Sequence, residues 1–244
     1  MKNALFIQAR SNSTRLPKKI LKKILGKTIL EHFILRIKKS KKIDKILLLT
    51  TYNKIDDKII EIANKCKIET FRGSENNVLE RFYKASINLN IDYIIRCNAD
   101  CPLIDYKIID RMVTYYNKNR SIDYLSNILE KSFPIGMHVE IFKKNVLYDA
   151  QKNCKSTRRR EHVTPYIYNS KKFNIKNYKN KVDNSSHRWT LDYYEDLIFI
   201  KKIYKLIYNK NKYYGMNDII KLVNKNPELK KINYHIEKTN NVVY

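Results

Sequence analysis

Apolar residues recur along the first half of the chain in two alternating patterns, continuous runs and helical spacings. The continuous runs predict buried strands at residues 5–7, 45–51 and 92–97, and a further strand is expected at 68–71. Between them, apolar residues three and four positions apart predict helices at 29–37, 56–66 and 77–89. Successive strand–helix units imply right-handed crossovers, so we predict a three-layer, doubly wound α/β fold with a mostly parallel sheet. Ligands of such sheets bind at the carboxyl ends of the strands.

The second half of the chain is less regular. Strand-like segments at 123–129 and 137–142 flank Phe133-Pro134-Ile135-Gly136, which indicates an extended excursion. The remaining pattern predicts a helix at 158–169 interrupted near Pro165, a short strand at 187–192, helices at 196–208 and 216–224, and a polar tail. No repeat or composition break divides the chain, so we expect one domain over residues 1–244.

Composition narrows the compartment and the partners. Hydrophobic residues make up 43% of the chain, as in globular proteins, and no apolar run is long enough to span a bilayer. The N-terminal stretch Met1–Arg10 is too short for a signal sequence and has no cleavage site, so we expect a cytoplasmic protein. The net charge of +26 suggests nucleic acid, but the lysines are spread evenly and no RNP motif, zinc-finger spacing or basic heptad is present. We therefore expect anionic small molecules, and neither nucleic acid nor a membrane, as partners.

Four cysteines raise the question of a metal or disulfide site. They are Cys66, Cys97, Cys101 and Cys154. Their spacing does not match a zinc site, which needs closer pairs and further Cys or His ligands. The pattern indicates reduced, partly buried thiols.

The segment from Gln8 to Lys19 directly follows the first predicted strand. It carries Arg10, Arg15 and Lys19, with small polar residues between the two arginines. Guanidinium and ammonium groups bind phosphate oxygens and stabilise the charge that develops during attack at phosphorus. The segment has neither the P-loop nor the dinucleotide-binding glycine pattern. A solvated basic loop is the alternative, but the position behind a strand favours a triphosphate site.

This segment resembles the Q/P-A-R-x-x-S-x-R-L-P-x-K signature of bacterial cytidylyltransferases, which include the enzymes that make CMP-Kdo and CMP-sialic acids. The closest resemblance is to the spore-coat polysaccharide biosynthesis group. It spans nearly the whole chain, with further matching motifs in the same order at 71–81, 100–105, 160–166 and 188–193.

The resemblance implies catalytic roles for Arg10, Arg15, Lys19 and Asp100, and it makes Asp100 and Asp192 ligands of Mg²⁺. Magnesium prefers hard oxygen donors, and usually takes one or two carboxylates with phosphate oxygens and water. Two alternatives stay open: Asp100 could form the turn before Cys101-Pro102, and Asp192 could cap the helix that follows.

The resemblance also implies binding residues. The nucleotide-binding candidates are Gln8, Ala9, Ser11, Ser13, Ser74, Arg81 and Asn98. The acceptor-binding candidates are His138, Glu140, Arg160, His162 and Arg188. Strand alternation would place His138 and Glu140 on one side, and Arg160 and Arg188 are the stronger candidates for an anionic acceptor. Alternatively Asn98 caps a turn, Arg81 pairs with an acidic residue of its own helix, and the histidines are surface residues.

The implied reaction is transfer of CMP from CTP to an acidic sugar or a small phosphorylated or carboxylated acceptor, with release of pyrophosphate, in surface polysaccharide biosynthesis. The resemblance further implies a homodimer whose interface includes the excursion at 121–145. Two positions depart from the family pattern, because Lys18 and Ala99 stand where glycine is common. The rival hypotheses are a glycosyltransferase, for which no D-x-D motif lies near Asp100, and an RNA-binding module.

Overall fold

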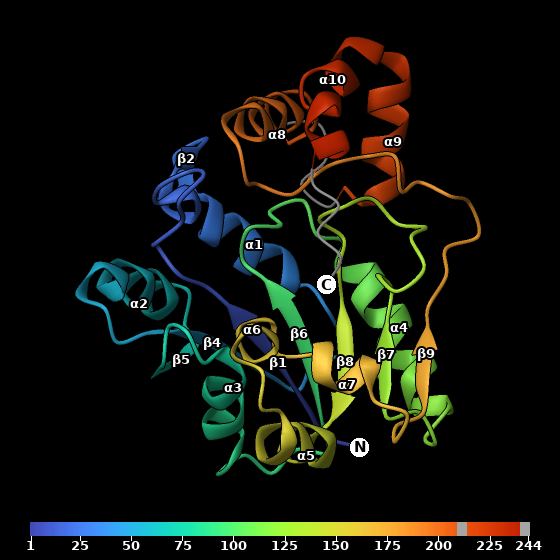
Figure 1. The fold of residues 1–244 in the computed structure, drawn as a ribbon. Coiled ribbons are helices and arrows are strands. Elements are labelled where there is room, and N and C mark those ends of the chain that lie inside the picture. The colour runs from blue at the N-terminus through green and yellow to red at the C-terminus, as the bar shows by residue number, and fades with distance from the viewer. Residues whose placement is uncertain (209–213, 240–244) are drawn as a thin grey trace.

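A computed structural model describes residues 1–208 and 214–239, in which seven strands form one sheet (Figure 1). Their order across the sheet is β5-β4-β1-β6-β8-β7-β9. In chain order the strands are β1 Asn3–Gln8, β4 Lys45–Thr51, β5 Glu69–Gly73, β6 Tyr93–Asn98, β7 Tyr124–Ser126, β8 Glu140–Lys143 and β9 Ile175–Asn177. Strand β8 pairs antiparallel with both neighbours, and every other pairing is parallel. The predicted mostly parallel sheet is confirmed.

Helices connect the strands and cover the sheet on both faces (Figure 1). They are α1 Ile29–Ile37, α2 Asp57–Lys65, α3 Val78–Ser86, α4 Tyr106–Lys118, α5 Lys144–Asn153, α6 Thr157–His162, α7 Pro165–Asn169, α8 Tyr194–Ile207, α9 Met216–Lys225 and α10 Pro227–Lys231. The short elements are the hairpin β2 Lys23–Ile24 and β3 Lys27–Thr28, and the 3-10 turns Lys19–Leu21, Lys54–Asp56 and Tyr234–Thr239. Helices α8, α9 and α10 gather at one end of the molecule (Figure 1).

The central strand β1 explains why the predicted strands are continuously apolar. Leu5 and Ile7 belong to the core shared with α1, α4 and α8, whereas Ala4 and Phe6 belong to the core shared with α3 and α5. Successive side chains of a strand point to opposite faces, so a strand covered on both faces needs apolar residues throughout. The result is the predicted three-layer architecture.

The helix predicted at 158–169 is interrupted, as expected. Helices α6 and α7 are separated by Val163 and Thr164, and Pro165 is the first residue of α7. The φ of Val163, 70°, is positive. Proline suits the first position of a helix, because the N–H that proline lacks would have no acceptor within the helix there.

The strand predicted at 187–192 is wrong. This segment forms one isolated bridge, in which Ile135 N donates to His187 O at 2.9 Å and Trp189 N donates to Ile135 O at 2.7 Å. Gly136 allows the close approach, because a Cβ there would lie 2.7 Å from Thr190 N and its own φ is 102°. A pairing this short fixes the segment in place but cannot extend into a ladder.

The remaining expectations concern thiols, the membrane and the dimer. All four cysteines are free thiols, as predicted. Among residues 1–208 and 214–239, no helix has the length and apolar character to cross a bilayer. The excursion at 121–145 contributes β7 and β8 to the sheet, and the dimer stays a prediction. The predicted polar tail beyond residue 239 lies outside the described residues.

Candidate active site

A cleft of about 580 Å³ lies where β1 and β6 end, at the edge predicted from the parallel sheet. One wall is the loop that follows β1, and the opposite wall comes from residues 127–138 and 185–192. Glu75 and Asn76, which follow β5, line it as well. Asn12 of the β1 loop donates to Glu75 at 3.2 Å and so links two parts of the lining.

The loop after β1 is held by a buried carboxylate, Asp56. Ser11 N donates to Asp56 Oδ1 at 2.8 Å, and the hydroxyls of Thr50 and Thr51 donate to Oδ2 at 3.0 and 2.6 Å. Ser11 O in turn accepts from Lys18 N at 3.2 Å, which closes the loop. Because its backbone is fixed at Ser11, the loop presents its cations from a defined position.

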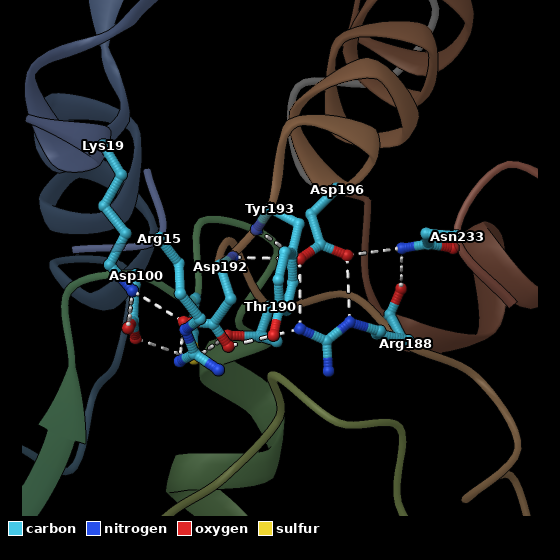
Figure 2. Close-up of polar contacts among 10 residues, drawn as sticks. Arg15, Lys19, Asp100, Arg188, Thr190, Asp192, Tyr193, Asp196 and Asn233 are labelled. Carbon is cyan, nitrogen blue, oxygen red and sulfur yellow. Dashed lines mark hydrogen bonds and ion pairs between the residues drawn. The ribbon is translucent and has the colours of Figure 1, made fainter. Parts of the chain in front are cut away.

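Lys19 joins the two predicted acidic residues across the cleft (Figure 2). Its ammonium donates to Asp100 Oδ2 at 2.5 Å and to Asp192 Oδ1 at 2.9 Å. Arg15 Nη2 also donates to Asp192 Oδ1 at 2.9 Å. The arrangement thus brings two loop cations and both carboxylates to one point.

A second buried carboxylate, Asp196, holds the other side of this cluster (Figure 2). Arg188 donates to both oxygens of Asp196 at 3.0 Å and to Asp192 Oδ2 at 3.2 Å. Asp196 also accepts from the backbone amides of Asp192 and Tyr193, at 2.9 and 3.0 Å. Asn233 donates to Asp196 Oδ1 at 2.9 Å. Asp192 is therefore oriented through both its side chain and its backbone. The residue that caps the N-terminus of α8 is Asp196, not Asp192.

The charges of the cluster stabilise one another. Burial alone would lower the pKa of Lys19, but the carboxylates of Asp100 and Asp192 raise it above the ordinary lysine value. Burial would likewise raise the pKa of Asp192, but Lys19, Arg15 and Arg188 lower it. Lys19 and Asp192 are thus both charged near neutral pH.

The cleft contains most of the candidates predicted from the sequence. Those that line it are Gln8, Ala9, Arg10, Ser13, Arg15, Lys19, Asn98, Asp100, His138, Arg188 and Asp192. Arg10 makes a long ion pair of 3.7 Å with Glu161, and both side chains are substantially exposed. Burial lowers the pKa of His138, so its imidazole is neutral at pH 7.

Two of the predicted acceptor-binding residues are committed elsewhere. Arg160 lies outside the cleft, where its guanidinium donates to Asn77 Oδ1, Gln151 O, Gln151 Oε1 and Cys154 O. Glu140 is buried and paired with Arg96. Both side chains are thus paired within the protein, and their role in binding an acceptor stays a prediction. His162 lies on α6 and does not line the cleft.

Three predicted nucleotide-binding residues support the cleft from behind. The side chain of Ser11 is buried against Asp56 and Ile55, and Ser74 Oγ accepts from Asn77 N at 3.0 Å. Arg81 is buried and donates to Ser74 O at 3.1 Å. Burial and the like charge of Arg10 lower the pKa of Arg81 to about 10. Gly73 makes room for it, since a Cβ there would lie 2.7 Å from Arg81 Cγ.

Sequence reasoning missed three residues that shape the site. Asp56 and Asp196 hold its two walls, and Lys131 lines the cleft. The available signal was the closeness in sequence of Arg188, Asp192 and Asp196, three groups of opposite charge within nine residues. No comparable local signal pointed to Asp56, whose partner Ser11 is distant in the sequence.

The residues present fit a hard divalent cation. Asp100 Oδ2 and Asp192 Oδ1 converge on a single nitrogen, so the two carboxylates already point at one cationic centre. Carboxylate pairs of this kind, completed by phosphate oxygens and water, suit Mg²⁺. In the described residues no group of three or more His, Cys, Asp or Glu side chains gathers as a metal cluster.

The fold and the cleft define the class of the protein, the α/β nucleotidyltransferases that resemble nucleotide-diphospho-sugar transferases. Residues 4–239 match the model of the family described as Cytidylyltransferase. A cytidylyltransferase structure from Leptospira borgpetersenii is 39% identical, with a TM-score of 0.90, 94% of this chain and 97% of that chain covered. The spore coat polysaccharide biosynthesis protein SpsF of Bacillus subtilis is 29% identical over 93% of this chain and 97% of the relative. The 3-deoxy-manno-octulosonate cytidylyltransferase of Fusobacterium nucleatum is 30% identical over half of each chain, 50% and 49%.

The chain belongs to the cytidylyltransferase family, whose members are CTP-dependent nucleotidyltransferases. The resemblance found in its motifs is thereby confirmed.

Proposed function

We propose that this enzyme transfers CMP from CTP to an acidic sugar, or to a small phosphorylated or carboxylated acceptor, in surface polysaccharide biosynthesis. One observation carries the proposal: Lys19, from the loop after β1, contacts both Asp100 and Asp192 inside the cleft that Arg10 and Arg15 also line. Cations that bind phosphate, placed beside carboxylates that bind a cation, match what the reaction of a metal-bound triphosphate requires.

The chain's own groups position the reaction and stabilise its charge. Arg10, Arg15 and Lys19 bind the triphosphate and stabilise the negative charge on the departing pyrophosphate. An oxygen of the acceptor attacks the α-phosphorus, the bond to the bridging oxygen breaks, and no covalent enzyme intermediate forms. Arg188, fixed by Asp196, keeps Asp192 in place throughout.

We include Mg²⁺ in the proposal, with Asp100 and Asp192 as the residues that would hold it. Bound there, it would supply positive charge beside the α-phosphate and so make the phosphorus more electrophilic.

The acceptor binds against the wall formed by residues 127–138. This wall combines Phe133 and Ile135 with the cation Lys131 and the neutral His138. Since Arg160 is committed outside the cleft and Arg188 is committed to two carboxylates, Lys131 takes the role of binding the acceptor's anionic group. A carboxylate or phosphate beside an apolar sugar face matches this lining.

A pyrophosphate-release assay tests the function. All four nucleoside triphosphates are incubated with Mg²⁺ and a panel of acidic sugars and phosphorylated metabolites. We expect release with CTP and at least one acceptor, and a glycosyltransferase would give none. An RNA-binding module predicts salt-sensitive RNA binding that is indifferent to Asp100→Ala and Asp192→Ala. Absence of release from every pair would overturn the proposal, and light scattering tests the homodimer separately.

A further inference from the structure

Gln8, the last residue of β1, is tied to a buried ion pair that no role in the proposed reaction yet explains. Arg96 on β6 donates to Gln8 Oε1 at 2.9 Å and forms an ion pair with Glu140 on β8. Glu140 also accepts from the hydroxyls of Tyr124 and Thr164, both at 2.6 Å. The side chains of Arg96 and Glu140 are 10% and 6% exposed, so water does not compete for these bonds.

This network decides which way the Gln8 amide faces. A carboxamide has similar shape in both orientations, so its hydrogen-bond partners determine which end carries the oxygen. Arginine has only donors, and therefore the oxygen of Gln8 must face Arg96. Arg96 cannot turn away, because Glu140 is an acceptor only and is itself held by two hydroxyls.

The amide nitrogen of Gln8 is consequently a donor with a fixed direction. Gln8 lines the cleft, and within the described residues its nitrogen makes no hydrogen bond. It stands directly before Ala9 and Arg10, where the cationic loop leaves β1, so a nucleotide held by that loop passes beside it. A neutral donor there suits an uncharged lone pair of the sugar or base, since the phosphates are matched by the cations.

We propose that Gln8 binds CTP through its amide nitrogen and that Arg96 is the positioning residue that holds this donor toward the nucleotide. The inference rests on the proposed function, because it takes CTP as the ligand.

Calorimetric titration with CTP and Mg²⁺, without acceptor, tests both parts. Gln8→Met removes the donor at nearly constant shape and is expected to raise the Kd for CTP about three- to tenfold, the effect of one neutral hydrogen bond. Arg96→Met combined with Glu140→Met removes the buried pair together, which avoids leaving a lone charge. It is expected to raise the Kd by the same factor.

The triple variant separates positioning from general loosening. If Arg96 acts through Gln8, adding Gln8→Met to the pair variant changes the Kd no further, because the effects of coupled residues do not add. If the rise in Kd caused by Gln8→Met and the rise caused by the pair variant multiply in the triple variant, Arg96 does not act through Gln8 and the positioning role is overturned. Lys143→Met combined with Asp123→Met, which removes an ion pair at the end of β8 away from Glu140, is the matched control and should bind CTP as the wild type does. An equal loss in this control would also overturn it.

If the apolar pair variant does not fold, Arg96→Gln with Glu140→Gln replaces it. Amides at both positions can donate or accept, so Gln8 is no longer fixed and the same loss is expected. If the wild type prefers CTP over the other nucleoside triphosphates and Gln8→Met binds CTP with the same Kd, the inference about Gln8 is overturned and the proposed function is not. A wild type without preference for CTP would instead count against the proposed function.

Discussion

The backbone amide of Leu191 donates a hydrogen bond to the carbonyl oxygen of Asp100 at 2.9 Å. This bond joins the end of β6 to the segment before α8, although the two are far apart in the sequence. The next residue after Leu191 is Asp192, so the two carboxylates are aligned by the backbone and not only by the cations between them. The pair is therefore built into the fold, which is the property expected of a reaction centre.

The first prediction uses the two ends of strand β6. Asp100 follows this strand in the cleft, whereas Asp92 precedes it and accepts from Lys2 N at 2.7 Å. Asp100→Asn should lower the rate of CTP-dependent pyrophosphate release by about a hundredfold or more, since metal-assisted charge stabilisation supplies several kcal/mol. Asp92→Asn is the control and should retain the wild-type rate. Comparable rates in the two variants would remove Asp100 from the catalytic centre.

The second prediction concerns the buried support of the cationic loop. Asp56→Asn replaces one accepting oxygen by a donor, which must face either the amide of Ser11 or the hydroxyls of Thr50 and Thr51. We expect a loss of about 1–3 kcal/mol in the free energy of unfolding at pH 7. We also expect weaker CTP binding, because the loop is fixed through Ser11.

The pH dependence of this loss provides its own check. Burial would raise the pKa of Asp56, but hydrogen bonds from Thr51, Ser11 and Thr50 lower it below the ordinary value. A carboxyl whose pKa is depressed by folding contributes stability above the unfolded pKa, about 4, and this contribution is lost as the pH falls through the folded pKa. The gap in Tm between wild type and Asp56→Asn should therefore narrow below about pH 4. A gap that is constant down to pH 2 contradicts the assignment.

The sequence predicts the strands better than the connections between them. Continuous apolar runs located β1, β4 and β6 because those strands are buried on both faces, whereas β5 lies at the edge of the sheet and is only partly buried. Helix α4 was overlooked although Ile108, Ile109, Met112, Val113 and Tyr116 carry the helical spacing. The segment 187–192 was assigned as a strand because composition cannot distinguish one bridge from a ladder.

At the site, the sequence identifies the charged candidates but does not show which residues each of them pairs with. Lys19, Asp100 and Asp192 meet as expected, because strand ends and the loop after β1 share one edge of the sheet. The partners of Arg160 and Glu140, among them Gln151 and Arg96, are brought to them by tertiary packing, so the sequence did not show these pairings.

The third prediction concerns Lys18, the first of the two departures from the motif pattern noted in the sequence. Its φ of 54° and ψ of 30° are left-handed, a conformation that disfavours side chains with a Cβ. Ala99, the second departure, is not among the residues with positive φ. Lys18→Gly should raise the free energy of unfolding by up to about 1 kcal/mol, whereas Lys18→Ala should not, because alanine keeps the Cβ. Equal stability of both variants in urea denaturation would contradict this account of the strain.

The last prediction follows from the position of the Lys19 ammonium between Asp100 and Asp192. The side chain of Lys19 is only 11% exposed, so in the absence of nucleotide its charge, and not solvent, neutralises both carboxylates. A divalent cation entering alone must displace this ammonium and also approach Arg15 and Arg188. Triphosphate binding removes the obstacle, because the phosphates offer Lys19 another partner. Lys19→Met should therefore bind Mn²⁺ without nucleotide at least about tenfold more tightly than the wild type, as measured by the electron paramagnetic resonance signal of free Mn²⁺. Lys22→Met, three residues along and not lining the cleft, is the control and should bind as the wild type does. Adding Asp100→Asn to Lys19→Met should abolish the gain. If Lys19→Met gains no affinity, the ammonium does not occupy the place of the metal, and the two carboxylates must be assigned another role.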